Sequence, residues 1–493
     1  MEVKEHRNAI ISVSNKEGLG KVAKFLISNN FRLFATSGTR SFLEKEGIDC
    51  ESVEGLTGHP EILGGRVKTL STSLLAGILA ADRSDEGLRR FGYVPIDLVY
   101  VELYNFIDSF LRGEKDLTEF IDVGGVTMLR AAAKNYHRVI PVPGREAMEK
   151  VMNVMKDGNV PPEVRASLAG ETFRLTSFYD YAISEWLGGS EGYFVTGGRE
   201  SVRLRYGENP HQTARAYSFY PPFFDVIKSG KEVSFNNIID AWAAWDLALR
   251  LGEGSASVVK HASPCGAATG PDSVKRAYES DPISAYGGIL AYNGSLDEVS
   301  ATFIKDKFLE VVIAGNYEEG ARNILDKKKN LRLLVGKRES YRIPDIRSAG
   351  NVLLVQEWNN RGSPLMDIIT GIPREGLIED VRFGWEVVKS IKSNAVAIVK
   401  DKWLVSSCGG QPNRVDSVKI ALDRAHYNDR LDPNGVLISD GFFPFPDSLE
   451  IADKSGIHYI AAPLGSIRDN EVLDYASGKG MTFIEIKERG FKH

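Results

Sequence analysis

The sequence predicts an α/β protein with more than one domain, and three observations support this fold class. The chain has 493 residues, more than the ~100–200 residues of a typical domain, so about two to four domains are expected. Hydrophobic residues make up 43% and charged residues 26%, the balance of a folded globular protein. Short apolar runs alternate with segments of helical spacing, which favours parallel sheets flanked by helices.

The amino-terminal part contains the clearest alternation. The apolar runs at 9–14, 32–35 and 98–101 are predicted strands, and residues 19–26 have the spacing of a helix. Hydroxyl-rich loops at 12–16 and 36–39 lie at the ends of the first two strands. Ligands of parallel sheets bind where strand ends meet helix amino termini, so these loops are predicted to bind a phosphate. The alternative is that their Ser and Thr side chains only cap helices.

A domain boundary is predicted near residues 195–200. Residues 143–187 have mainly helical patterns, and a polar, glycine-rich break follows at 188–192. This break matches the G-x-S-x-G pattern of hydrolases, but a nucleophile elbow needs a preceding strand, so a linker is the better interpretation. The second half is again α/β, with a helix at 240–251 and strands at 257–260, 395–399, 436–439, 459–462 and 482–486.

Charge and cysteine content exclude several classes of function. The 61 basic and 66 acidic residues give a net charge of −5, without the basic excess that a nucleic-acid-binding surface requires. The three cysteines are scattered, which argues against a disulfide framework and fits a reducing cytoplasm. We find neither a signal peptide nor an apolar run of the ~18 residues needed to span a membrane. We therefore expect a cytoplasmic protein whose partners are small molecules rather than nucleic acids or membranes.

Common cofactor motifs are missing from the chain. It has no G-x-x-x-x-G-K-[ST], no H-E-x-x-H and no G-x-G-x-x-G between a strand and a helix. The segment from His261 to Cys265 is similar to the start of a zinc-deaminase motif, H-x-E followed by P-C-x-x-C. However, Ser263 stands at the Glu position and Ala268 at that of the last Cys. No metal site is expected.

Nine short polar motifs nevertheless follow one another across the chain. They are Gly64-Gly-Arg-Val-Lys-Thr69, Ile121-Asp-Val-Gly-Gly125, Arg130-Ala-Ala-Ala-Lys-Asn135, Leu204-Arg-Tyr-Gly-Glu-Asn-Pro-His-Gln212, Phe235-Asn-Asn237, Val259-Lys-His-Ala-Ser-Pro-Cys-Gly266, Lys392-Ser-Asn-Ala395, Ser439-Asp-Gly-Phe-Phe-Pro-Phe445 and Gly465-Ser-Ile-Arg-Asp469. In this order they resemble the bifunctional AICAR transformylase/IMP cyclohydrolase family of purine biosynthesis. The resemblance runs from about residue 9 to the carboxyl terminus.

This resemblance implies an architecture and two reactions. Residues 1–198 are expected to form a methylglyoxal-synthase-like IMP cyclohydrolase with a helical linker, and residues 199–493 a transformylase of two cytidine-deaminase-like halves without zinc. The transformylase moves a formyl group from 10-formyltetrahydrofolate to the 5-amine of AICAR. The cyclohydrolase then closes the ring of the product, FAICAR, to give IMP and water.

Lys260 and His261 fit the difficulty of formyl transfer. The amine of AICAR is a poor nucleophile, and a neutral His can take its proton during attack. A neighbouring Lys can stabilise the oxyanion. Because adjacent residues on a strand point to opposite faces, the two side chains can converge only if the strand ends there. The resemblance implies that Asn394 orients the formyl oxygen. The alternative is a strand-end Lys beside a half-buried His.

The remaining transformylase residues are implied by the resemblance. The residues expected to contact AICAR are Arg205, Tyr206, Asn237, Lys328 and Arg489. The residues expected on the folate side are Tyr286, Gly287, Phe442 and Asp447. An aromatic ring there can pack on the pterin, and a carboxylate can accept its N–H groups. The lysine run around Lys328 has the alternative interpretation of a solvated face.

The resemblance maps ring closure to Lys68, Tyr104, Asp122 and Lys134. The two lysines would stabilise the oxyanion, while Tyr104 and Asp122 would move protons. The substrate and its phosphate are expected to contact Ser12, Ser14, Lys16, Thr36, Gly38, Thr39, Arg66 and Thr69. Lys134 has an alternative interpretation as a surface lysine of a helix.

The amino-terminal half also departs from the family pattern. The usual K-T-L-H-P becomes Lys68-Thr-Leu-Ser-Thr72, and N-L-Y-P becomes Glu102-Leu-Tyr-Asn105. A glutamate beside an anionic substrate is unfavourable unless it is paired or faces away. Two alternatives to the bifunctional enzyme follow: a transformylase with an impaired cyclohydrolase, and a non-catalytic purine-nucleotide sensor. The family further implies a homodimer, and a bound monovalent cation is left open.

Overall fold

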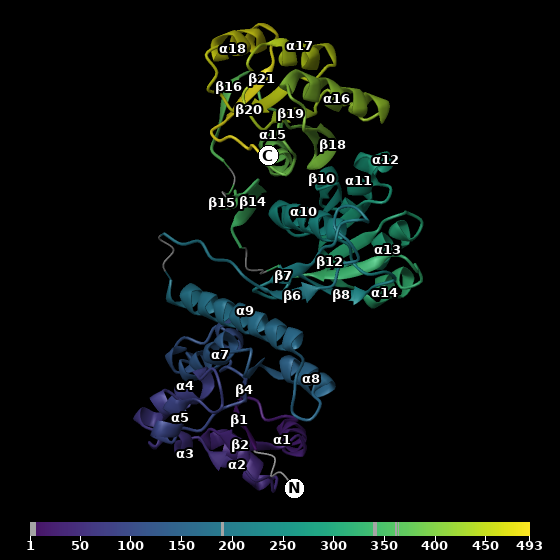
Figure 1. The fold of residues 1–493 in the computed structure, drawn as a ribbon. Coiled ribbons are helices and arrows are strands. Elements are labelled where there is room, and N and C mark those ends of the chain that lie inside the picture. The colour runs from purple at the N-terminus through teal and green to yellow at the C-terminus, as the bar shows by residue number, and fades with distance from the viewer. Residues whose placement is uncertain (1–5, 189–191, 339–342, 360–361, 363) are drawn as a thin grey trace. The chain divides into compact units, whose positions relative to one another are not determined.

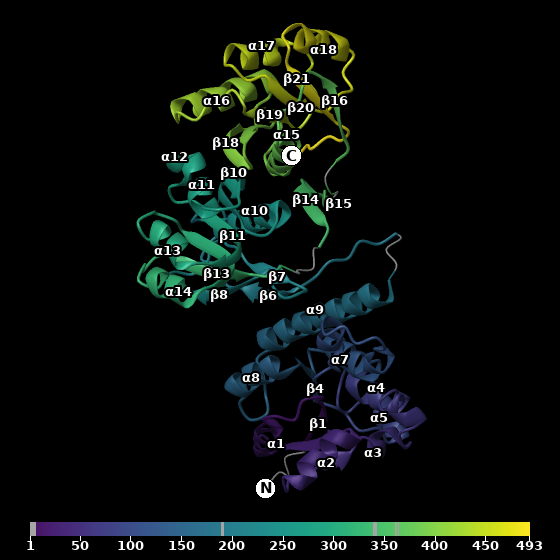
Figure 2. The same ribbon diagram turned by 180° about the vertical axis from the view of Figure 1, so that it is seen from behind.

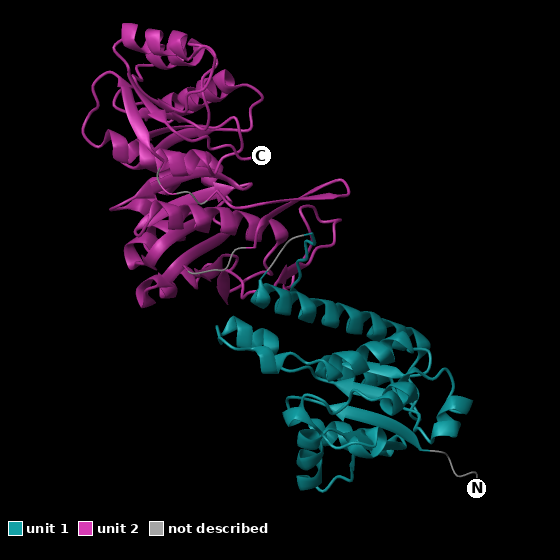
Figure 3. Ribbon diagram, turned by 90° about the vertical axis from the view of Figure 1, so that its left-hand side faces the viewer, with its two compact units in different colours: residues 1–198 teal, residues 199–493 magenta. Residues whose placement is uncertain are grey.

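The computed structural model describes residues 6–188, 192–338, 343–359, 362 and 364–493. The chain divides into two compact units, residues 1–198 and 199–493 (Figure 3). The predicted linker at 188–192 falls largely on residues 189–191, which lie outside the described residues. Each unit is considered by itself.

Unit 1 is built on a parallel sheet of five strands in the order β3-β2-β1-β4-β5 (Figure 1). Every neighbouring pair is parallel. The strands are β1 (Arg7–Ser12), β2 (Phe31–Ala35), β3 (Glu51–Ser52), β4 (Leu98–Val101) and β5 (Ile140–Pro143). The parallel sheet predicted from the alternation of strands and helices is confirmed.

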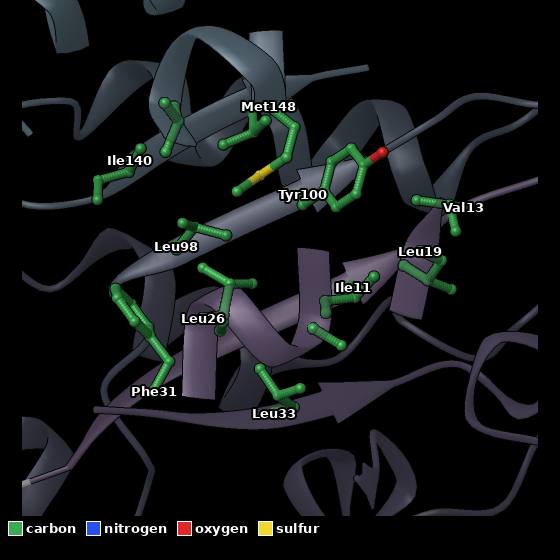
Figure 4. Packing of buried hydrophobic residues seen from close by; sticks show 14 of the residues in the cluster. Ile11, Val13, Leu19, Leu26, Phe31, Leu33, Leu98, Tyr100, Ile140 and Met148 are labelled. Atoms are coloured by element: carbon green, nitrogen blue, oxygen red, sulfur yellow. The ribbon is translucent and has the colours of Figure 1, made fainter. Parts of the chain in front are cut away.

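Alternate residues of the central strands enter two cores, one on each face of this sheet. On one face, Ile11, Leu98 and Tyr100 pack against helices α1 (Leu19–Ser28) and α8 (Arg145–Val154) (Figure 4). On the other face, Ile10 and Val99 pack against α4 (Thr72–Leu79) and α7 (Gly124–Lys134). Each large apolar side chain buried in this way contributes about 1.5–3 kcal/mol. The polar ends of these strands are left free to carry a site.

The other helical segments of unit 1 surround the sheet. They are α2 (Ser37–Lys45), α3 (Glu54–Thr57), η1 (Leu63–Gly65), α5 (Glu86–Phe91), α6 (Phe106–Leu111), η2 (Thr118–Phe120) and α9 (Pro162–Leu187). Helix α9 has Pro at its first position, where the missing N–H costs nothing.

Unit 2 contains a mixed sheet of twelve strands, and its first half begins with helix α10 (Phe235–Leu251) (Figure 2). After α10 come β9 (Ser255–Lys260), β10 (Ser263–Thr269), α11 (Ser273–Ser280), α12 (Pro282–Ala285), β11 (Ile289–Leu296), α13 (Glu298–Lys305), β12 (Val311–Tyr317), α14 (Glu319–Leu325) and β13 (Arg332–Gly336). Strand β8 (Phe224–Lys228) runs antiparallel to β13 at the edge.

The second half repeats this arrangement. It consists of α15 (Leu377–Val388), β17 (Val396–Lys400), β18 (Trp403–Cys408), α16 (Arg414–Tyr427), β19 (Val436–Ser439), α17 (Asp447–Lys454), β20 (Tyr459–Ala462), α18 (Asp469–Gly478) and β21 (Thr482–Ile486). Strand β16 (Met366–Thr370) runs antiparallel to β21 at the opposite edge. Strands β10 and β18 pair antiparallel and join the halves. Trp245 of α10 and Trp385 of α15 are both fully buried.

Two small antiparallel sheets complete unit 2. One pairs β6 (Arg199–Val202) with β7 (Ala216–Ser218), and the other pairs β14 (Asp345–Ala349) with β15 (Val352–Gln356). The strands expected at 257–260, 395–399, 436–439, 459–462 and 482–486 and the helix at 240–251 are all found, with slightly shifted ends. The predicted α/β class is confirmed for both units.

Two candidate active sites

The carboxyl edge of the sheet in unit 1 opens into a cavity of about 420 Å³. Lys68 follows η1 and Tyr104 follows β4, and both side chains line this cavity together with Asp122. The ammonium of Lys68 donates a hydrogen bond of 2.8 Å to the hydroxyl of Tyr104. Three of the four residues expected to close the ring therefore lie around one space.

Asp122 is fixed by the chain around it. Its carboxylate accepts the N–H of Gly125 at 2.7 Å, at the start of α7. Its own N–H donates to the hydroxyl of Tyr179 at 2.8 Å, and that hydroxyl donates to the carbonyl of Phe120 at 2.6 Å. Burial raises the pKa of Asp122, while the Gly125 N–H and the charge of Lys68 oppose the shift. A carboxyl group held in this way is suited to proton transfer.

The two glycines at the start of α7 allow this close packing. A Cβ at Gly125 would lie 2.5 Å from Oδ2 of Asp122, and a Cβ at Gly124 would lie 2.2 Å from Oγ1 of Thr69. Neither distance is compatible with a side chain at these positions. Thr69, expected to contact substrate, is buried against this turn and lines the cavity.

The expected phosphate loops lie side by side at the same edge of the sheet. Lys16 donates to the hydroxyl of Thr39 at 3.0 Å and to the carbonyl of Val13. The hydroxyls of Ser12 and Thr36 are 3.4 Å apart, and Thr36 is the N-cap residue of α2. Burial lowers the pKa of Lys16, reinforced by the charge of Lys68 and opposed by Glu102.

The remaining two residues of these loops are placed differently. Ser14 donates to the carbonyl of Leu103 at 3.1 Å, so its hydroxyl proton is already used within the protein. At Gly38, in the first turn of α2, a Cβ would meet no heavy atom within 4 Å. The space beside the amino terminus of α2 is therefore open.

The departures from the family pattern leave this geometry intact. Glu102 turns toward the face of β4 that carries Tyr100, whose hydroxyl donates to the glutamate at 2.6 Å, and Arg145 lies 3.8 Å away. The glutamate is thus paired, and its side chain is only 13% exposed. Ser71 is the N-cap residue of α4 and accepts the N–H of Leu74 at 3.2 Å. Serine is among the preferred residues for that position.

Lys134 lies apart from the cavity in unit 1. It is the last residue of the eleven-residue helix α7, which begins at the cavity with Gly124. A helix of that length spans ~15 Å, so the exposed Lys134 lies near the opposite end from Asp122. Arg66 lines the cavity but forms an ion pair with Glu119.

In unit 2, Lys260 and His261 lie at the tip of the hairpin formed by β9 and β10. Strand β9 ends at Lys260, as convergence of the two side chains requires, and β10 begins at Ser263. His261 and Ala262 form a two-residue turn with φ of 54° and 56°. The ammonium of Lys260 donates to the carbonyl of Tyr286 at 2.8 Å.

The residues expected on the folate side separate into two groups. Tyr286 is 61% exposed, and its ring lies tilted against that of Phe308, with the ring centroids 4.9 Å apart. Gly287, with a φ of 76°, donates its N–H to the carbonyl of Phe308 at 2.8 Å. Phe442 and Asp447 belong to the second half, where Arg489 lies 5.3 Å over the Phe442 ring. Only Tyr286 and Gly287 are beside the Lys260 hairpin.

Residues expected to bind AICAR are found near a half-exposed glutamate, Glu310. Asn237, buried in the first turn of α10, donates to Glu310 at 2.8 Å and forms a reciprocal cap with Ser234. A guanidinium nitrogen of Arg332 lies 3.8 Å from the carboxylate of Glu310. Burial lowers the pKa of Arg332, and the charge of the nearby Arg205 lowers it further. Arg205 lies 4.9 Å over the ring of Tyr206.

Lys328 has a structural position instead. Its ammonium donates to the carbonyls of Ile304, Lys305 and Lys307 at the end of α13, at 3.3, 2.7 and 2.6 Å. An ammonium has three protons, so all its donors are used within the protein. Burial lowers the pKa of Lys328. This lysine therefore stabilises a helix end, and its ammonium protons are donated to main-chain carbonyls.

A second cavity, of about 530 Å³, lies between the two halves of unit 2. Lys260 and His261 line it from the first half, and Gln411 lines it from the second. Asn394 does not line the cavity, but its amide donates to the carbonyls of Gln411 and Pro412 at 3.0 and 3.1 Å. Its oxygen accepts from Arg414 at 2.8 Å. Both protons of Asn394 are therefore used, and it holds the cavity wall.

Sequence reasoning missed Tyr179, Asp240 and Glu310. Tyr179 lies within α9 with no local motif, so nothing in the sequence indicates its contact with residue 122. For Asp240, a signal existed: an aspartate five residues before a buried tryptophan occurs in α10 and again, as Asp380, in α15.

Within the described residues, no group of three or more His, Cys, Asp or Glu side chains is arranged to hold a metal ion. The thiols of Cys50, Cys265 and Cys408 are free, and burial raises the pKa of Cys50 and of Cys265 to about 12. Over the same part of the chain, no helix has the length and apolar character needed to cross a lipid bilayer.

The fold and both cavities define a two-unit α/β protein with a charged site at the carboxyl edge of a parallel sheet and another at a hairpin tip. The family model described as AICARFT/IMPCHase bienzyme matches residues 132–424, and the model described as MGS-like domain matches residues 18–127. The chain belongs to the AICARFT/IMPCHase bienzyme family, as the resemblance predicts.

Curated relatives match over the full length. The bifunctional purine biosynthesis protein PurH of Clostridium botulinum (strain Kyoto / Type A2) is 40% identical, covering 99% of this chain and 100% of the relative. PurH of Aquifex aeolicus (strain VF5) is 39% identical, covering 98% and 100%. PurH of Bacteroides thetaiotaomicron is 38% identical, covering 100% of both. A solved structure titled "Crystal structure of ForH" is 35% identical over 37% of this chain and 100% of that chain, with a TM-score of 0.32.

Proposed function

We propose that this chain catalyses both reactions of its family, with ring closure of FAICAR in residues 1–198 and formyl transfer to AICAR in residues 199–493. The observation that carries the proposal is the contact of Lys68 with Tyr104 beside the half-buried Asp122. A nucleotide sensor needs no such acid–base cluster. Full-length similarity to PurH proteins supports the assignment of both activities.

Ring closure is an intramolecular attack of the carboxamide nitrogen of FAICAR on its formyl carbon. The phosphate is held by the loops around Lys16 and Thr39 beside the amino terminus of α2. Lys68 stabilises the oxyanion that forms on the formyl oxygen. Asp122 accepts the proton of the attacking nitrogen, and Tyr104, bonded to Lys68, protonates the oxyanion to a hydroxyl. The nitrogen of the former formamide then loses its proton to Tyr104 as the C=N bond forms, and Asp122 returns its proton to the hydroxyl, which departs as water.

Formyl transfer uses the hairpin tip. The amine of AICAR attacks the formyl carbon of 10-formyltetrahydrofolate while His261 accepts the amine proton. Lys260, held by the carbonyl of Tyr286, stabilises the tetrahedral oxyanion. When this intermediate collapses, the formyl group stays on AICAR and tetrahydrofolate leaves with a proton on its nitrogen. Arg205, Tyr206 and Asn237 contact AICAR, and the exposed ring of Tyr286 packs on the folate.

The proposal assigns Asn394 and Lys328 no direct contact with substrate, because their donors are occupied within the protein. Phe442, Asp447 and Arg489 lie in the second half of unit 2. We assign these three residues to a folate and nucleotide surface that a second copy of the chain completes. No metal takes part in this proposal, and the position of a bound monovalent cation is not assigned.

We further propose that the enzyme is a homodimer in the cytoplasm. Strand β15 exposes four consecutive apolar side chains, Val352, Leu353, Leu354 and Val355, at 43–58%. Both faces of strand β15 are therefore apolar and accessible, an arrangement that another protein surface normally covers. Symmetric pairing of two chains is the commonest way to cover such a surface. Three free thiols fit a reducing compartment.

A second candidate is a transformylase with an impaired cyclohydrolase, and the position of Lys134 favours it. An assay of the purified full-length protein with FAICAR as the only substrate distinguishes the two candidate functions. Formation of IMP at an enzyme-like rate supports the bifunctional enzyme, whereas IMP formation at only the uncatalysed rate, with intact formyl transfer, supports the second candidate. Omitting 10-formyltetrahydrofolate from this assay ensures that ring closure is measured by itself.

A further inference from the structure

The two hairpins of unit 2 are built alike. The β9–β10 hairpin turns through His261 and Ala262, with φ of 54° and 56°. The β17–β18 hairpin turns through Asp401 and Lys402, with φ of 52° and 51°. Left-handed backbone is unfavourable for an L-residue, so each turn holds two unfavourable residues side by side. Both turns need an external source of stabilisation.

In each hairpin one carboxylate supplies it. Asp240 of α10 accepts the N–H of His261 at 3.1 Å and the N–H of Ala262 at 2.6 Å. Asp380 of α15 accepts the N–H of Asp401 at 3.0 Å and the N–H of Lys402 at 2.6 Å. Hydrogen bonds to a charged group are stronger than those between neutral groups, so two of them can offset the cost of the backbone. A carboxylate with two acceptor oxygens fits two adjacent N–H groups.

The side chains around the two turns differ. At the second turn, Lys400 is paired with Asp432, and Asp380 also binds Arg374 at 2.5 Å. That turn is held by Asp380, and both Asp380 and Lys400 have partners of opposite charge. At the first turn, Lys260 donates to a neutral carbonyl, and His261 lines the cavity between the halves. The same arrangement, one aspartate bound to two N–H groups of a turn, therefore holds the candidate catalytic residues in the first half and a structural turn in the second.

We propose that Asp240 is a positioning residue for formyl transfer, fixing the turn so that His261 and Lys260 face the same substrate. The inference rests on the proposed transformylase function. Asp240 acts through the main chain of the turn and touches neither substrate. His261 directly follows the last residue of β9, so a change in its φ redirects its side chain relative to Lys260. Catalytic groups misplaced by ~1 Å can lose about 100-fold in rate.

Groups around Asp240 agree with a carboxylate held for this purpose. Burial raises its pKa, and the N–H groups of Ala262 and His261 oppose the shift. The charge of the neighbouring Glu310 raises the pKa of Asp240 further. Asp240 also lies one helical turn along α10 from Asn237, whose side chain donates a hydrogen bond to Glu310. The turn, the Glu310 cluster and the expected AICAR contacts are therefore connected through one face of α10.

The test compares Asp240→Asn with Asp380→Asn in the full-length protein. Asparagine keeps one acceptor but presents N–H groups to the second turn amide, so each variant loses one of the two bonds. Asp380→Asn also breaks the contact with Arg374 and should lower Tm at least as much as Asp240→Asn. We expect Asp240→Asn to lower kcat for formyl transfer at least tenfold, with the Kd for AICAR changed less than threefold. We expect Asp380→Asn to keep kcat within twofold.

The outcomes separate this inference from the proposed function. Wild-type protein that transfers no formyl group overturns the proposed function itself. An active wild type whose Asp240→Asn variant keeps kcat within twofold overturns only the role of Asp240. Equal kcat losses in both variants also overturn it, because a general loss of structure would then explain the effect. If Asp240→Asn is insoluble, Asp240→Glu keeps both acceptors displaced by one methylene, and unchanged kcat in that variant overturns the inference.

Discussion

The two candidate sites differ in how much of each is assembled within its own unit. In unit 1, Lys68 touches Tyr104, and Asp122 lines the same cavity of about 420 Å³. In unit 2, Lys260 and His261 share one hairpin tip, while Phe442, Asp447 and Arg489 lie in the other half of the sheet. The first site is compact and the second is distributed.

The difference follows the chemistry that we propose. Ring closure joins two groups of one molecule, so a single pocket that holds one ligand supplies most of the required orientation. Formyl transfer brings together a nucleotide and a folate, and two large ligands need surfaces that one hairpin does not provide. A compact site should therefore lose activity through single contacts, and a distributed site through the few groups that touch the reacting atoms.

The largest expected effect is at the hairpin tip. His261→Ala should lower formyl transfer by ~10²–10⁴-fold, the contribution of a positioned acid–base group, while AICAR still binds and FAICAR cyclisation is unchanged. The measurement is the steady-state rate of each half-reaction. His426→Ala, an exposed histidine of α16 outside the cavity lining, serves as the control and should leave both rates unaltered. Unchanged turnover in His261→Ala would refute the assignment.

The next effect tests the compact site. Lys68→Met should lower FAICAR cyclisation by ~10²–10³-fold, as expected for removal of an oxyanion donor, and leave formyl transfer intact. Lys134→Met is the matched control, because the structure places Lys134 near the far end of α7. We expect it to change cyclisation less than threefold. An equal loss in both variants would show that Lys134 reaches the substrate, as the family resemblance implies, and that the compact site is incomplete in one chain.

A smaller effect concerns the loop that presents Lys68. Ser71→Ala removes the N-cap bond to Leu74 and should lower the free energy of unfolding by about 1 kcal/mol. Ser167→Ala, on the exposed surface of α9, is the control and should cost nothing. Chemical denaturation of both variants measures the difference. If Ser71→Ala lowers the free energy of unfolding no more than its control does, Ser71 does not stabilise α4 as an N-cap residue.

The smallest effect tests whether the compact site holds its carboxyl at a cost. Burial raises the pKa of Asp122 in the folded state, so protonation of Asp122 favours folding. Its favourable contribution is present at low pH and is lost as the pH rises through the folded pKa. Asp122→Asn should therefore become more stable relative to wild type as pH increases, while cyclisation is lost. Unfolding curves from pH 4 to 8 measure the difference in stability between Asp122→Asn and wild type. A difference that does not change with pH would contradict a raised pKa of Asp122 in the folded state.

The sequence predicts the framework and part of each site for identifiable physical reasons. Continuous apolar runs such as residues 98–101 must be buried on both faces of a parallel sheet, so the positions of these strands can be predicted from the order of apolar residues along the chain. The family resemblance, rather than a strand or turn pattern, predicts that Lys68 and Tyr104 share a site, and the structure brings their side chains into contact.

The other residues depend on tertiary contacts that no local pattern encodes. The hydroxyl of Tyr179 accepts the N–H of Asp122, a residue 57 positions away in the chain. The ammonium of Lys328 donates to carbonyls at the end of α13. From the sequence, Glu102 is an unfavourable charge beside an anionic substrate, but the structure pairs it with the hydroxyl of Tyr100 and places it close to Arg145. Such pairings are set by which side chains the sheet brings together, not by their order.

The most direct test is one assay of the intact protein with AICAR and 10-formyltetrahydrofolate, scoring FAICAR and IMP separately. If one chain carries a distributed transfer site and a compact cyclisation site, FAICAR should appear transiently and IMP should accumulate to one equivalent per formyl group transferred. Failure to form either product would contradict both sites. Accumulation of FAICAR without IMP would contradict the compact site alone.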